Sequence, residues 1–97
     1  MDMDMNKYTE IAEVLKALAH PVRLCIVRGL IAKGSCNVCH MQECLGMPQS
    51  TTSQHLQKLR SAGIISGQRK GLEVNYQVCD PRVIKLIETL FPEQKEG

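Results

Sequence analysis

The spacing of the apolar residues changes from a helical to a strand period near residue 63, and this change limits the fold more than any other feature. Up to Gly63 the apolar residues recur every three or four positions, as on one face of an α-helix. Residues 73–78, EVNYQV, alternate instead between apolar and polar side chains, as a half-buried strand does. Residues 83–91 return to helical spacing. The chain is therefore predicted to be mostly helical, with one small β-element.

Two helices are predicted before residue 35. Residues 7–18 form the first, with Asn6 as its N-cap. His20-Pro21 opens the second, because proline is tolerated in the first turn of a helix. Gly34 ends it, because glycine readily adopts the left-handed conformation that closes a helix.

Two further short helices are predicted between residues 37 and 63, joined by a tight turn. Asn37 is expected to cap the first of them, which Gly46 ends. The next begins at Gln49 or Ser50 and continues to Gly63. Its inward face is expected to consist of Thr52, Leu56 and Leu59.

The remaining residues predict a hairpin and a last helix. IISGQ forms the first strand, RKG the turn and EVNYQV the second strand, after which Asp80-Pro81 caps the last helix. The resulting order is α-α-α-α-β-β-α. Two short helices followed at once by a basic-tipped hairpin are typical of a winged helix-turn-helix, whose second helix enters the DNA major groove.

The length of 97 residues predicts a single domain spanning residues 1–97, with frayed ends at about 1–5 and 93–97. A chain this small is marginally stable alone. The first and last helices carry more apolar residues than such a core can cover. We therefore expect a homodimer that packs these two helices together.

The charge of the chain is distributed unevenly, although its formal net value is only +2. Residues 44–72 contain no Asp or Glu. The same stretch carries five basic or titratable side chains: His55, Lys58, Arg60, Arg69 and Lys70. A basic centre between more acidic ends predicts an anionic partner for the middle of the chain.

The outer face of the helix at 49–63 is made of hydroxyl and amide side chains. A solvated helix face usually mixes Glu and Lys, whereas short polar side chains can approach base edges closely, and glutamine can bind adenine through two hydrogen bonds. Nearby cations would neutralise phosphates. The predicted DNA contacts are Gln49, Ser50, Thr51, Ser53, Gln54, His55, Lys58, Arg60, Arg69 and Lys70.

Three segments of the chain resemble the arsenic-repressor (ArsR/SmtB) family of bacterial winged-helix regulators. They are LKALAHPVRLCIVRGL, LGMPQSTTSQHLQKLRSAGII, and RKGLEVNYQV with the DP that follows Cys79, so that the resemblance spans residues 10–91. It implies a homodimeric repressor that leaves its double-stranded operator when an inducer binds. The dimer contacts in this family come mostly from the first and last helices. Thr52 departs from the pattern, which usually has an aliphatic residue there.

The thiols match the family pattern only in part. Members that sense thiophilic metals often have Cys-x-Cys at the start of the third helix, where this chain has Asn37 and Cys39. The local pair is Cys36 and Cys39, and two thiols at a helix N-terminus can hold a soft metal ion or form a disulfide. Two ligands are too few for zinc or trivalent arsenic. Redox or sulfide-type chemistry, soft-metal binding and a repressor without a thiol sensor all stay open, and DNA binding itself is expected to need no cofactor.

The remaining potential sites are interpreted as structural. Cys25, Cys44 and Cys79 are expected to be small buried residues. Zinc-sensing members of the family use an Asp-x-His pair at the start of the last helix. Asp80 matches, but Arg82 replaces the histidine, and its cation disfavours a divalent metal.

Other classes of protein fit the sequence less well. No βαβ pattern surrounds the thiols, which disfavours a thioredoxin-like protein. The sequence also lacks a recognisable pattern of catalytic residues, so we do not expect an enzyme. A winged helix that binds protein instead of DNA is the main alternative. The acidic start does not resemble a signal peptide, and LCIVRGLIA is too short to span a membrane. With an odd count of five cysteines, the chain is expected to be cytoplasmic, with reduced thiols.

Overall fold

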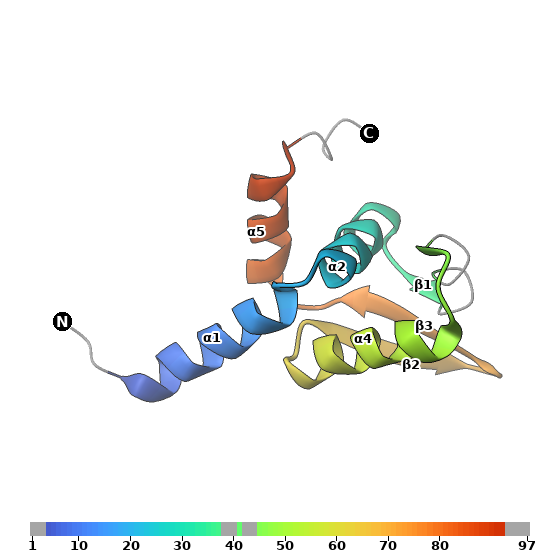
Figure 1. Cartoon of the computed structure of the whole chain (residues 1–97), viewed down its shortest axis with the longest axis horizontal. Helices are drawn as coiled ribbons and strands as arrows, with labels where there is room; N and C mark the ends of the chain where they lie inside the picture. Colours follow the sequence, from blue (N-terminus) through green and yellow to red (C-terminus); the bar gives the residue numbers. More distant parts are fainter. Residues whose placement is uncertain (1–3, 38–40, 42–44, 93–97) are drawn as a thin grey trace.

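The computed structural model describes residues 4–37, 41 and 45–92 (Figure 1). In chain order its elements are α1 (Met5–Leu18), α2 (Pro21–Lys33), β1 (Cys36–Asn37), α4 (Gln49–Ser61), β2 (Ile65–Lys70), β3 (Glu73–Val78) and α5 (Pro81–Leu90). Met41 and Leu45, between β1 and α4, also have helical backbone. The predicted winged helix-turn-helix architecture is confirmed.

The two prolines begin helices as predicted. Pro21 and Pro81 occupy the first turn of α2 and α5. The preceding residues cap these helices, since His20 Nδ1 accepts the N–H of Val22 at 3.1 Å and Asp80 Oδ1 accepts the N–H of Arg82 at 2.9 Å. The predicted cap of α1 is wrong: the carboxylate of Asp4, not Asn6, caps this helix, accepting the N–H of Asn6 at 3.1 Å. An aspartate two positions earlier is an equally good cap and gives a longer helix.

The β-element is a sheet of three antiparallel strands, in the order β1-β3-β2. The hairpin pairs β2 with β3 from Ile65↔Val78 to Lys70↔Glu73, so the turn consists of Gly71 and Leu72 and not of RKG. Gly71 has φ +65°, which only glycine adopts without strain. On its other side β3 pairs with β1, which the sequence did not predict. Asn37 lies in this strand, opposite Asn75, and the start of the helix that it was predicted to cap lies outside the described residues.

The core lies where α2 and α4 meet the sheet. Its buried side chains are Leu18, Ile26, Val27, Leu30, Met41, Leu56, Leu59, Ile64, Ile65, Val83 and Ile87. Thr52 is also fully buried, and its hydroxyl donates to the carbonyl of Pro48 at 3.2 Å. The polar group is thus satisfied within the helix, which explains why a threonine is tolerated in an apolar position.

The helices α1 and α5 project from the body that α2, α4 and the sheet form (Figure 1). Several of their large apolar side chains are exposed, namely Met5, Tyr8, Ile11, Leu15 and Leu90. A hollow of about 110 Å³ between the two helices is lined by Ile11, Val14, Leu15, Arg82, Val83 and Leu86. Such an apolar surface suits a partner helix better than water. Within the described residues, no helix combines the length and the apolar character needed to cross a membrane.

Candidate nucleic-acid interface

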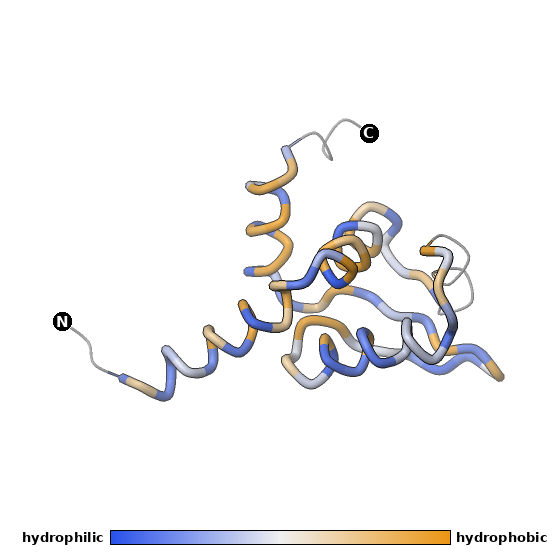
Figure 2. Tube along the Cα trace, in the orientation of Figure 1, coloured by the Kyte–Doolittle hydropathy of each residue, from blue (hydrophilic) through white to orange (hydrophobic). Residues whose placement is uncertain are grey.

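The helix α4 is amphipathic and lies along the sheet. Its buried side chains are Thr52, Leu56 and Leu59, as predicted. Figure 2 shows α4 mostly in hydrophilic colours, whereas α2 and α5 are mostly hydrophobic. The predicted contact residues Gln49, Ser50, Ser53, Gln54, Lys58 and Arg60 are exposed, and Thr51 is half-buried. The structure therefore brings the hydroxyls and amides together on one accessible face, with two cations toward the C-terminal end of the helix.

The hairpin extends beside the N-terminal end of α4. Arg69 and Lys70 are exposed at the end of β2, and Leu72 at the tip is fully exposed. A hollow of about 290 Å³ between helix and hairpin is lined by Asn37, Gln49, Ser53, Leu72, Glu73, Val74 and Tyr76. Its acidic residue, Glu73, is paired in register with Lys70 across the hairpin. The first turn of α4 and the hairpin thus line one hollow, and the basic residues at the end of β2 are exposed on the same hairpin.

His55 is placed differently from the other predicted contacts. It is half-buried, and its Nδ1 atom lies 3.3 Å from Nη1 of Arg23 in α2. Its ring centroid is 4.7 Å from that of His20. Burial, followed by the charges of His20 and Arg23, lowers the pKa of His55 from its ordinary 6.5. The side chain is therefore directed toward α2. Neither His20 nor Arg23 was singled out from the sequence as a partner, although both belong to the HPVR segment that opens α2.

Of the predicted pair of thiols, Cys36 and Cys39, the structure describes only Cys36. Cys36 is half-buried in β1, where its S–H donates to the carbonyl of Asn37 at 3.4 Å. Cys39 and Cys44 lie outside the described residues. Among the described residues, Cys25 and Cys36 line one cavity of about 120 Å³, with Ile26, Gly29, Leu30, Lys33, Met41 and Leu45 as its other lining residues. In the described part of the chain, no three His, Cys, Asp or Glu side chains are grouped so as to hold a metal ion.

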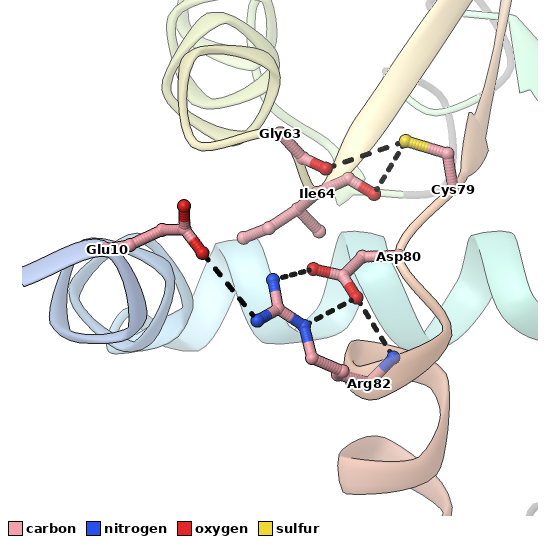
Figure 3. Close-up of polar contacts among 6 residues, drawn as sticks. All are labelled: Glu10, Gly63, Ile64, Cys79, Asp80 and Arg82. Carbon is pink, nitrogen blue, oxygen red and sulfur yellow. Dashed lines mark hydrogen bonds and ion pairs between the residues drawn. The ribbon is translucent and has the colours of Figure 1, made fainter. Parts of the chain in front are cut away.

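The expectation that Cys25 and Cys79 are buried is wrong, because both are exposed. Cys25 lies on the outer side of α2, next in sequence to the buried Ile26. Cys79 follows the last residue of β3, and its S–H faces the carbonyls of Gly63 at 3.5 Å and Ile64 at 3.6 Å (Figure 3). The burial of a small apolar residue can be predicted only when it is known which face of its helix or strand the residue lies on.

At the start of α5, Arg82 is bound to the carboxylate that the zinc-type pattern would use. Its Nη2 lies 2.8 Å from Asp80 Oδ2 and its Nε 3.1 Å from Oδ1 (Figure 3). Its Nη1 is 4.0 Å from Oε1 of Glu10 in α1. The hydrogen bond from the Arg82 side chain is the main reason that the pKa of Asp80 falls below its ordinary 3.8. The arginine thus occupies the place that the pattern reserves for a ligand and a metal.

Comparisons with known proteins identify a family of regulatory proteins to which the chain is similar. The family described as "Bacterial regulatory protein, arsR family" matches residues 20–66. The chain is 43% identical to the transcriptional repressor PagR of Bacillus anthracis over 83 residues, which are 86% of this chain and 83% of that protein. The crystal structure of PagR superimposes with a TM-score of 0.82 at 39% identity, covering 90% of this chain and 99% of PagR.

Two other solved structures are similar in fold. HlyU from Vibrio cholerae has a TM-score of 0.84 at 30% identity, with 93% of this chain and 96% of HlyU covered. The homodimeric winged helix-turn-helix DNA-binding domain Mb0332 from Mycobacterium bovis has a TM-score of 0.81 at 30% identity, with 99% and 91% covered. The solution structure of that domain is described as homodimeric.

Proposed function

The chain belongs to the arsR family of bacterial regulatory proteins, and from this premise we propose that it is a homodimeric repressor that binds a double-stranded DNA operator in the cytoplasm. The observation that carries the proposal is the exposed, carboxylate-free face of α4 beside the basic wing. That face has the shape and chemistry of a recognition helix, and the wing supplies cations at its end.

The polar surface divides into readers and anchors. Gln49, Ser50, Thr51, Ser53 and Gln54 occupy the first turns of α4, where a recognition helix meets base edges. Lys58, Arg60, Arg69 and Lys70 flank them and would bind phosphates, which fixes the register of the protein on DNA without reading sequence.

The proposed dimer interface is the apolar surface of α1 and α5. Its exposed residues include Tyr8, Leu15 and Leu90, and these residues and the hollow between the two helices would be covered by the same helices of a second copy. The similar domain from Mycobacterium bovis, which is homodimeric, supports the proposal of a homodimer. Two recognition helices would then meet half-sites about 34–36 Å apart, one turn of DNA.

The proposed regulators are the thiols of Cys36 and Cys39, of which only Cys36 is described. Cys36 pairs with Tyr76 of the wing strand, so a chemical change at this thiol acts directly on the sheet that carries the wing. The inducer is either a redox or sulfide-type reagent or a soft metal ion, and its binding weakens the hold on the operator. A repressor that has no thiol sensor would respond to none of these reagents.

The function is tested by measuring the binding of the reduced protein to random and selected DNA fragments over a range of salt concentrations. We expect a selected sequence to bind more tightly than random DNA, and both affinities to fall steeply with salt because phosphate contacts release counterions. A protein that binds no duplex, or that binds a protein partner with weak salt dependence, would instead support the winged-helix interaction module.

A further inference from the structure

Arg23 connects three helices through a single guanidinium group. Its Nε donates to the carbonyl of Ala17 in the last turn of α1 at 2.6 Å. Its Nη1 lies 3.3 Å from Nδ1 of His55, in the middle of α4. Arg23 itself belongs to the first turn of α2. One side chain thus bridges the end of α1 and the recognition helix.

The contact with His55 defines the protonation of the histidine. Arginine has only hydrogen-bond donors and stays charged, so His55 Nδ1 must offer a lone pair, and the ring proton is carried by Nε2. A doubly protonated His55 would turn this hydrogen bond into a repulsion between two cations. The neighbouring His20 cannot replace His55 as an acceptor for Arg23 through its Nδ1, because that atom already accepts the N–H of Val22.

The charged groups around this contact add to the effect. Arg23 and Lys58, together with Glu13 and Lys16 from α1, line a hollow of about 500 Å³ beside it. The one acid among these residues, Glu13, lies 3.7 Å from Lys16. His20, the N-cap of α2, is a further titratable group beside this contact, since its ring centroid lies 4.7 Å from that of His55. A proton added to His55 would therefore enter surroundings that are already positive.

We propose that Arg23 and neutral His55 are positioning residues that set α4 against α1, so that the operator is read only while this hydrogen bond is intact. The inference rests on the proposed function of α4. Because α1 also belongs to the proposed dimer surface, the Arg23 contact fixes the recognition helix relative to the partner subunit. The two recognition helices of a dimer must fit their half-sites at the same time, so a small tilt of α4 in each subunit weakens operator binding at both half-sites.

The sign of the pH dependence distinguishes this role from direct DNA contact. A histidine that touches phosphate binds DNA more tightly when it is protonated, because it gains a positive charge. A histidine that must accept from Arg23 weakens operator binding when it is protonated. Acidification through the titration range of histidine, near about pH 6.5, therefore changes the operator affinity in opposite directions in the two cases.

The experiment measures the affinity for operator and for random duplex at constant ionic strength between about pH 7.5 and about 5.5. We expect the wild type to lose about tenfold in operator affinity on acidification, while random DNA is bound equally well or better. His55→Gln keeps a carbonyl acceptor at every pH, so it should retain binding at pH 7.5 and lose this pH dependence. His55→Lys should bind the operator weakly throughout. Tighter operator binding in acid, or a His55→Gln profile equal to that of the wild type, would overturn the proposal.

Arg23 is tested separately, with Arg60→Ala as the matched loss of one cation on α4. Arg23→Ala should lower operator affinity about tenfold and leave the salt slope unchanged, whereas Arg60→Ala should reduce the slope by about one. Arg23→Lys keeps the charge but can donate to only one of the two acceptors, Ala17 and His55, so it should give an intermediate loss of operator affinity. This variant also provides the test if Arg23→Ala does not fold. An unchanged affinity in Arg23→Lys and a reduced slope in Arg23→Ala would mean that Arg23 contacts phosphate. If the wild type binds DNA specifically but shows no pH effect, this inference fails and the proposed function stands.

Discussion

Nη2 of Arg82 lies 2.8 Å from Oδ2 of Asp80, so that the first turn of α5 forms an ion pair with the N-cap of the same helix. The carboxylate also accepts the backbone N–H and the Nε–H of the same arginine (Figure 3). A metal ion at Asp80 would have to displace this arginine first. The chain has thus replaced a ligand position by an internal ion pair that also reaches Glu10 of α1.

This ion pair gives stability that depends on pH. The pKa of Asp80 is lower in the folded chain than its ordinary 3.8, mainly because of the hydrogen bond from Arg82. The contribution is therefore complete above about pH 4 and is lost as the pH falls through the folded value. Asp80→Asn keeps a good N-cap but removes the charge, and should lower the free energy of unfolding at pH 7 by up to about 1 kcal/mol, because Arg82 is largely exposed. Thermal unfolding should show the stability difference between the two proteins narrowing as the pH falls below about 4, and a constant difference would contradict this prediction.

Base reading and phosphate anchoring can be separated with two variants. Gln54→Ala should cost specific binding about 1–3 kcal/mol if the amide contacts a base edge, and should leave random DNA almost unaffected. Arg69→Ala should weaken binding to all sequences and lower the salt slope by about one. Titrations of both variants at several salt concentrations decide the point. The same behaviour in both would remove the division between readers and anchors.

The dimer interface predicts different effects of two exposed leucines. Leu15 lies on the apolar surface of α1, and Leu72 at the tip of the wing. Leu15→Asp would bury a charge in the proposed interface, so it should give a monomer and lose cooperative operator binding. Leu72→Asp introduces the same group away from that surface and should remain dimeric. Sedimentation at micromolar concentration measures both, and a dimeric Leu15→Asp protein would place the interface elsewhere.

Two glycines predict opposite effects on stability. A Cβ at Gly67 would lie 3.0 Å from Tyr76 Cε1 and 3.1 Å from Val74 Cγ1, so Gly67→Ala must displace side chains of β3 and should cost about 1–3 kcal/mol. A Cβ at Gly29, inside α2, would meet nothing within 4 Å. Gly29→Ala should therefore stabilise the helix by about 0.5–1 kcal/mol. Urea unfolding of the two variants tests the pair, and a neutral Gly67→Ala would mean that Tyr76 moves aside freely.

The thiols are tested with the Cys36→Ser, Cys39→Ser double variant. When reduced, the double variant should bind the operator normally. Its operator affinity should not change with zinc, arsenite, hydrogen peroxide or polysulfide. In the wild type, the reagent that is the inducer should weaken operator binding about 5–150-fold. Cys79→Ser, which changes a thiol away from the Cys25 and Cys36 cavity, is the control. A double variant that still responds would direct attention to Cys25, which lines that cavity.

The parts of the fold that depend on local sequence were predictable, and those that depend on distant contacts were not. His20-Pro21 and Asp80-Pro81 begin helices where expected, because a cap and a proline act within one turn. The strand β1 gave no signal, since two residues are too few to alternate, and its place is set by β3. In the same way, the spacing that put His55 on the flank of α4 could not show that Arg23 lies beside it.

The shortness of β1 also has a kinetic consequence. Cys36 and Asn37 contribute two residue pairs at the edge of the sheet, whereas β2 and β3 share six. Releasing a short edge costs far less than global unfolding, so such a segment opens while the helical core stays folded. Because Cys36 is half-buried, a bulky reagent would reach its thiol fully only during these openings. At a high concentration of such a reagent, the rate of modification would level off at the rate at which β1 opens. The protein, and not the reagent, would then determine how fast the thiol reacts.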